Sequence, residues 1–142
     1  MKEFFCVPLN ETITSQKRWS ELCRQYKSDE AAATQNGFEF NIHNVCLNPK
    51  KPIDVHEKTY QYSVNVCQYN NLFFVGSVFG ISTAGGCTPC SIDGKGYETE
   101  REAKRNELLK LLHWFECAKI PKAIKQIRAE LFNLAFVQLE LF

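Results

Sequence analysis

The cysteine and histidine residues are the side chains of this sequence most able to do chemistry. Residues 87–90 are Cys-Thr-Pro-Cys, the CxxC spacing from which zinc sites take two thiolates, so Cys87 and Cys90 are candidate metal ligands. Two pairs could supply the remaining ligands of a tetrahedral site: His43 with Cys46, and His113 with Cys117. Because there is no second CxxC, we expect no cofactor by default and keep zinc as the alternative.

The sequence offers little for catalysis. The chain has three histidines and no Gly-x-Ser-x-Gly turn, phosphate-binding loop or His-Glu-x-x-His pattern. A redox CxxC normally opens a helix, where the helix dipole lowers a thiol pKa, whereas residues 87–90 lie in a glycine-rich stretch. We therefore expect a binding protein and not an enzyme.

Basic side chains could contact phosphate. The net charge is only +1, from 17 Lys and Arg against 16 Asp and Glu, so any binding of nucleic acid must come from a local patch. The candidates are Arg101, Lys104, Lys122, Lys125 and Arg128, with Lys17 and Arg18 nearer the N-terminus. A solvated helix face also explains the spacing of the last three.

The composition is that of one globular domain. The chain has 142 residues, 44% of them hydrophobic, and no biased tract. We expect a single domain over 1–142, with a core over 12–118, a C-terminal helix over 119–137 and a possible docking tail over 138–142. No run approaches a membrane span and the N-terminus is too short for a signal peptide. We therefore expect a cytoplasmic protein with reduced, mostly buried cysteines and no membrane partner.

Hydrophobic periodicity predicts helices at the two ends of this core and strands between them. A helix is expected over 15–27, followed by a short helical piece at Ala31, Ala32 and Ala33. Period-two alternation predicts three strands: near 38–43, 60–67 and 73–81. Asn70-Asn71 should form a tight hairpin turn between the last two strands. Residues 48–52, with two prolines, and the glycine-rich residues 84–96 are expected to be loops.

Two more helices are expected toward the C-terminus. Thr99 and Glu102 fit a capping box, which predicts a helix over 100–117. Its apolar face, which should lie on the sheet, is Ala103, Leu108, Leu111, Leu112 and Phe115. Pro121 suits the first turn of a last helix. The apolar stripe of that helix is Ile120, Ala123, Ile124, Ile127, Leu131 and Leu134.

This order of elements resembles the double-stranded RNA-binding domain over residues 15–118, and Gly94-Lys95-Gly96 is similar to that family's glycines. The resemblance implies an α+β fold of α-β-β-β-α order, a three-stranded antiparallel sheet packed by helices, here with an extra C-terminal helix. Where that family clusters lysines at a helix start, this chain has Glu98, Glu100 and Glu102, which would repel phosphate. We therefore carry over the fold and not the RNA binding.

The last five residues, Gln138-Leu139-Glu140-Leu141-Phe142, resemble the docking motif by which bacterial replication and repair proteins bind the sliding clamp. The resemblance implies that Gln138 hydrogen-bonds at the clamp groove, that Leu139 enters one subsite, and that Leu141 with Phe142 fills the main hydrophobic pocket. Alternatively, these residues only end the last amphipathic helix, because no Gly, Ser or Pro linker precedes them.

Residues 76–103 contain paired glycines, Pro89 and Tyr97-Glu98-Thr99 ahead of a Glu-Ala helix start, and with these they resemble a small domain of phage and plasmid proteins associated with DNA partitioning and modification. We therefore expect a non-catalytic phage or mobile-element accessory protein that binds a component of the host DNA machinery, with the sliding clamp as first candidate. One alternative is an anti-CRISPR-type inhibitor that blocks a host defence nuclease by protein contact, through the strand edges of Tyr60–Phe79 or the basic helix. The other is a nucleic-acid-binding domain.

Overall fold

The computed structural model describes residues 16–17 and 28–140, and side chains as far as residue 135. The fold is α+β, as predicted. In chain order its elements are β1 (Ala33–Gln35), β2 (Phe38–Phe40), β3 (Lys50–His56), β4 (Tyr60–Tyr69), β5 (Leu72–Ile81), β6 (Gly85–Thr88), α2 (Glu100–Ala118) and α3 (Pro121–Glu140). Of the helix expected over 15–27, Gln16 and Lys17 are helical and the rest lies outside the described residues.

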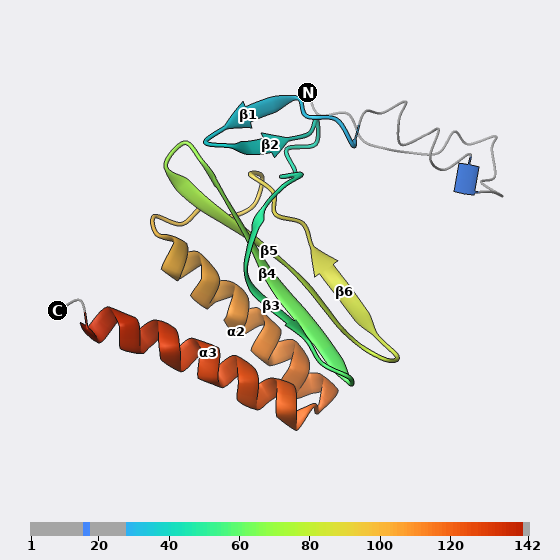
Figure 1. Ribbon diagram of the computed structural model, residues 1–142, viewed down its shortest axis with the longest axis vertical. Helices are drawn as coiled ribbons and strands as arrows, with labels where there is room; N and C mark the ends of the chain where they lie inside the picture. The colour runs from blue at the N-terminus through green and yellow to red at the C-terminus, as the bar shows by residue number, and fades with distance from the viewer. Residues whose placement is uncertain (1–15, 18–27, 141–142) are drawn as a thin grey trace.

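The main sheet has four antiparallel strands in the order β3-β4-β5-β6, so the predicted three-stranded sheet and α-β-β-β-α layout are wrong (Figure 1). The β4–β5 hairpin is confirmed: Asn70 and Asn71 have φ of 50° and 66°, as a type I′ turn requires. β3 forms where two prolines predicted a loop. Pro52 is tolerated because β3 is an edge strand whose register shifts between Lys50 and Ile53.

β6 is the other strand that was expected to be a loop. It folds back on β5, with Gly86 opposite Phe79. A Cβ at Gly86 would lie 2.9 Å from Cζ of Phe79, so glycine is what lets this strand pass the ring. The glycines that predicted irregular chain are here part of a strand.

β1 and β2 form a separate two-stranded sheet. The helical piece predicted at Ala31–Ala33 is wrong, since Ala33 begins β1. Asn36 and Gly37, expected to end a helix, instead have φ of 55° and 82° and form the turn of this hairpin. Gln35 hydrogen-bonds to Asn70 and so ties the small hairpin to the β4–β5 turn.

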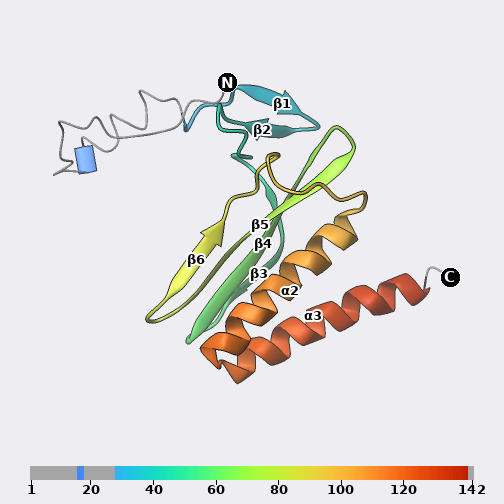
Figure 2. The ribbon, with the colours of Figure 1, turned by 180° about the vertical axis from the view of Figure 1, so that it is seen from behind.

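Both C-terminal helices follow the sequence expectation and lie side by side along one face of the sheet (Figures 1 and 2). Thr99 caps α2 by accepting a hydrogen bond of 3.1 Å from the backbone N–H of Glu102. Phe115 of α2 packs edge-on against Tyr60 and Tyr62, with ring centroids 6.1 and 5.9 Å apart. The predicted stripe of α3 joins this core through Ala123 and Ile127, both fully buried.

A second core cluster fills the opposite face of the sheet at the β4–β5 turn. Its buried members are Phe38, Phe40, Cys46, Cys67, Phe74 and Cys90. Three of them are thiols, and Sγ of Cys90 lies 3.3 Å from Sγ of Cys67. These cysteines are packing residues, as expected for most cysteines of a reduced protein.

Candidate anion-binding site at the helix elbow

The junction of α2 and α3, residues 116–128, gathers basic side chains around a depression; we call it the elbow. α2 ends at Ala118, and Lys119 then adopts the left-handed conformation with φ of 59°. The N–H of Lys119 donates to Glu116 O and the N–H of Ile120 donates to Phe115 O, which is the pattern of a Schellman cap. Pro121 is the first residue of α3, so Lys119 and Ile120 are the connection between the helices. Their backbone conformation therefore fixes the angle between α2 and α3.

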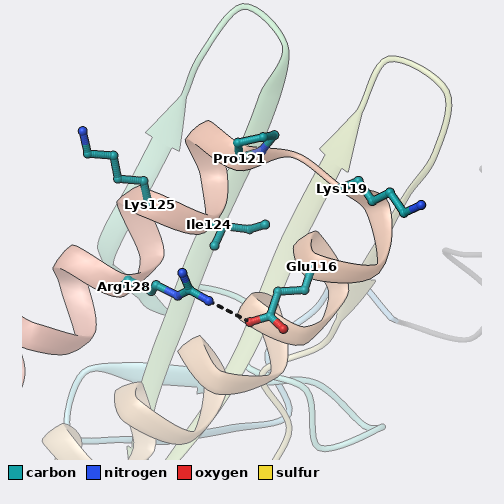
Figure 3. Close-up of a pocket in the computed structure, with 6 residues that line it drawn as sticks. All are labelled: Glu116, Lys119, Pro121, Ile124, Lys125 and Arg128. Atoms are coloured by element: carbon teal, nitrogen blue, oxygen red, sulfur yellow. Dashed lines mark ion pairs between the residues drawn. The ribbon is translucent and has the colours of Figure 1, made fainter.

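The depression has a volume of about 570 Å³ and an apolar floor of Pro121 and Ile124. Lys119, Lys125, Arg128 and Glu116 complete its lining. In Figure 3 the two lysines extend outward on opposite sides, and Arg128 reaches across the gap between the helices toward Glu116. Three cations and one carboxylate thus line the depression, and of the cations Arg128 is the one that approaches the carboxylate.

Glu116 neutralises this charge only weakly. Nη2 of Arg128 lies 3.8 Å from Oε1 of Glu116, with side chains 66% and 45% exposed, and an exposed pair of this kind contributes about 0–1 kcal/mol. Lys122 adds a fourth cation on the first turn of α3, which has no acidic residue. The N-terminus of α3 carries partial positive charge and the C-terminus of α2 beside it carries partial negative charge, so the side chains decide the sign of the elbow. The elbow is therefore a positive surface in a chain of nearly neutral net charge.

The structure divides the basic residues predicted from the sequence into two groups. Lys122, Lys125 and Arg128 lie at the elbow, whereas Arg101 and Lys104 lie at the start of α2, which at 1.5 Å per residue is about 27 Å from Lys119. Nε of Arg101 donates to Leu134 O over 2.9 Å, so this side chain ties α2 to α3. Lys17 is exposed, and Arg18 lies outside the described residues.

Lys119 and Glu116 are elbow residues that the sequence interpretation missed. Neither residue belongs to an apolar stripe or to a run of basic residues in the sequence. The available signal was the short Lys119-Ile120-Pro121 connection, which forces two helices to meet and brings their ends together.

The CxxC cysteines do not share a site. Cys87 is exposed on β6, whereas Cys90 is buried in the second core cluster and donates to Phe74 O over 3.3 Å. His113 and Cys117 lie together on α2, with Nε2 and Sγ 3.7 Å apart, and both are exposed. Across residues 16–17 and 28–140, no three His, Cys, Asp or Glu side chains are grouped so as to hold a metal ion.

Two of the clustered thiols, Cys46 and Cys67, are held in their protonated form. The hydrogen bond with Cys67, reinforced by burial, raises the pKa of Cys46 far above its ordinary value. For Cys67, the hydrogen bond with Cys46 lowers the pKa, but the hydrogen bond with Cys90 and burial together raise it to about 12. Thiols are nucleophiles and metal ligands only as thiolates, so these side chains are poorly suited to either role.

The proposed docking tail lies partly beyond what the structure describes. α3 continues to Glu140, so the backbone of Gln138 and Leu139 is helical. Their side chains, and all of Leu141 and Phe142, lie outside the described residues.

No protein-family model, curated protein or solved structure matches this chain. The resemblance to phage and plasmid domains therefore stays a prediction, whereas the α-β-β-β-α order on which the resemblance to the double-stranded RNA-binding domain rested is not the order of this fold. Among the helices of the described part of the chain, none is long and apolar enough to cross a membrane.

Proposed function

We propose that this chain is a non-catalytic binding protein of the DNA machinery and that its elbow binds the phosphate groups of nucleic acid. The observation that carries the proposal is the meeting of Lys119, Lys125 and Arg128 around one depression, with Lys122 beside them. Lysine and arginine are the usual partners of phosphate in proteins that bind nucleic acid.

The shape of the elbow supports phosphate contact more than the recognition of bases. The cations lie on the rim of an open depression, and the helix junction between them has no aromatic ring on which a base could stack. Contacts of this kind fix a protein on the backbone but carry no sequence information. We therefore expect weak binding that is independent of sequence and strongly dependent on salt.

A direct test is the fluorescence anisotropy of a labelled duplex of about 20 base pairs, titrated with the full chain at about 50 mM salt, where phosphate contacts are strong. The proposal predicts saturable binding that weakens as salt rises. No binding at low salt would reject nucleic acid as the partner of the elbow. The next class of partner to test would then be a protein with an acidic surface, such as a defence nuclease.

Two further proposals rest on sequence resemblance: that the protein belongs to a phage or mobile element, and that it binds the sliding clamp. Because α3 extends to Glu140, docking of Gln138-Leu139-Glu140-Leu141-Phe142 as an extended peptide would require the last helical turn to unwind. The end of a helix frays readily, so this cost is small.

The clamp proposal is tested separately from the elbow. The full chain and a version that ends at Val137 are compared for binding to purified bacterial sliding clamp. Loss of binding with the last five residues would support a docking tail, and equal or absent binding would reject it. Neither result changes the expected affinity of the elbow for DNA.

A further inference from the structure

A second recess lies between α2 and strands β5 and β6, on the side of the sheet that carries the helices. It has a volume of about 330 Å³ and shares no lining residue with the elbow. Its apolar walls are Phe79, Leu111 and Trp114, and its polar lining is Ser77, Thr88, Glu107, Lys110, His113 and Cys117. The rings of Phe79 and Trp114 are in contact, with centroids 4.7 Å apart. We call this recess the α2–β6 groove.

Glu107 places a carboxylate in the wall of the α2–β6 groove. Its side chain is only 1% exposed, which is unusual for a charged residue. Oε1 accepts a hydrogen bond of 2.7 Å from Oγ of Ser77. Oε2 forms an ion pair with Lys110, whose Nζ lies 3.7 Å away on a side chain that is 68% exposed. At 3.7 Å Lys110 is too far away for a hydrogen bond, so Oε2 can still accept one from a cation that enters the groove.

β6 supplies an open strand edge along the same groove. In the described part of the chain it pairs with β5 on one side and with nothing on the other, and all four of its residues are exposed. It lies at the margin of the sheet in both views (Figures 1 and 2). Gly85, Gly86, Cys87 and Thr88 include no charge and no proline, so their edge is open to pairing over the short length of β6, which ends before Pro89.

The ladder also shows which backbone groups are available. Ile81 donates to Ala84 O across the β5–β6 turn, and hydrogen-bonded pairs alternate along an antiparallel ladder. Cys87, opposite Val78, is therefore in a pair whose N–H and C=O point away from β5. These groups can receive the backbone of an added strand, as in other strand-addition complexes.

We propose that the α2–β6 groove binds an extended segment of a partner protein, which adds to the free edge of β6 and places one arginine or lysine side chain in the groove. The aliphatic part of that side chain lies against Phe79, Leu111 and Trp114. Its cationic end reaches Glu107 and gives the carboxylate a close donor. The added backbone provides affinity, and the buried carboxylate selects a basic residue.

The test uses three synthetic peptides that differ only at the central residue: acetyl-Thr-Val-Arg-Val-Thr-amide and its citrulline and norleucine versions. Each is titrated into the ¹⁵N-labelled full chain and followed by NMR. The arginine peptide is expected to shift the amides of β6 and the indole N–H of Trp114, and to bind at least about tenfold more tightly than the neutral citrulline peptide, as expected for loss of one charge-assisted pair.

Two variants separate the backbone and side-chain contributions. Glu107→Gln keeps an acceptor for Ser77 and should reduce the arginine peptide to the affinity of the citrulline peptide. Cys87→Pro removes the outward N–H and should weaken all three peptides. Because the peptide comparison is made on the unaltered chain, it remains decisive if either variant folds poorly. Equal affinity for arginine and norleucine, shifts away from β6, or no binding would overturn the proposal.

Discussion

The salt dependence of DNA binding gives a quantitative prediction for the elbow. On duplex DNA, each phosphate neutralised by a cation contributes about −0.9 to the slope of log K against log salt. If Lys119, Lys122, Lys125 and Arg128 each contact one phosphate, the slope is about −3.6. A fourfold rise in salt then weakens binding by about 150-fold.

The perturbation is the triple variant Lys119→Gln, Lys125→Gln and Arg128→Gln. One cation remains, so the slope should fall to about −0.9, and the same rise in salt should weaken binding by about three- to fourfold. Anisotropy titrations of the labelled duplex at several salt concentrations measure both slopes. The side chains are exposed or at a rim, so folding should be preserved.

A matched control carries the same change of net charge elsewhere: Lys50→Gln, Lys51→Gln and Lys104→Gln. It should keep a slope of about −3.6 if the elbow is the contact surface. Glu116→Gln releases Arg128 from its ion pair and should strengthen binding at low salt. The reasoning fails if the elbow variant keeps the steep slope, or if the control loses it to the same extent.

Four further predictions concern the fold and its thiols. Gly76→Ala should destabilise the protein by about 3 kcal/mol in urea unfolding, because the added Cβ would lie 2.3 Å from the backbone oxygen of Thr88; a loss below about 0.5 kcal/mol would contradict this. Lys119→Gly should stabilise the fold by about 0.5–1 kcal/mol, since glycine adopts φ of 59° without strain, and it should weaken DNA binding. A lower stability would argue against the left-handed cap at the end of α2. In the native state, thiol reagents at neutral pH should modify Cys87 and Cys117 but not the thiols of the second core cluster. Folding raises the pKa of Cys67 to about 12, so the contribution of this thiol to the free energy of unfolding should be complete below the unfolded thiol pKa of about 8.5 and should decline as pH rises toward 12. A free energy of unfolding that stays constant over that range would contradict the raised pKa.

Local signals in the sequence predicted the parts of the fold that short-range physics determines. The paired asparagines at 70 and 71 adopt positive φ at little cost, so their hairpin was visible. Thr99 could be recognised as a cap from its own side chain and that of Glu102. The stripes of α2 and α3 depend only on helical periodicity, and the structure confirms both.

The parts that were wrong depend on pairing between distant residues. Pro52 argued against a strand, but it is accepted because β3 has a neighbour on one side only. Gly85 and Gly86 predicted a loop, although they form a strand by pairing with Gly80 and Phe79 of β5. Ala33 has a strong helix propensity that the pairing with Phe40 overrides.

The candidate sites were predictable to different degrees. The spacing of Lys122, Lys125 and Arg128 placed them on one helix face, but not against Lys119, because that contact depends on how the two helices meet. The split of Cys87 from Cys90 depends on β6, which the sequence did not reveal. Helical spacing places Glu107 between Ala103 and Leu111 on the predicted apolar face, but its charge argued against burial, because glutamate is rarely buried.

The most direct test of the central claim is an NMR titration of the ¹⁵N-labelled full chain with a duplex of about 20 base pairs at about 50 mM salt, where phosphate contacts are strong. If the elbow is the nucleic-acid surface, the largest amide shifts will lie within residues 116–128 and will disappear in the Lys119, Lys125 and Arg128 variant. Shifts centred on Arg101 and Lys104, or none at all, would contradict it.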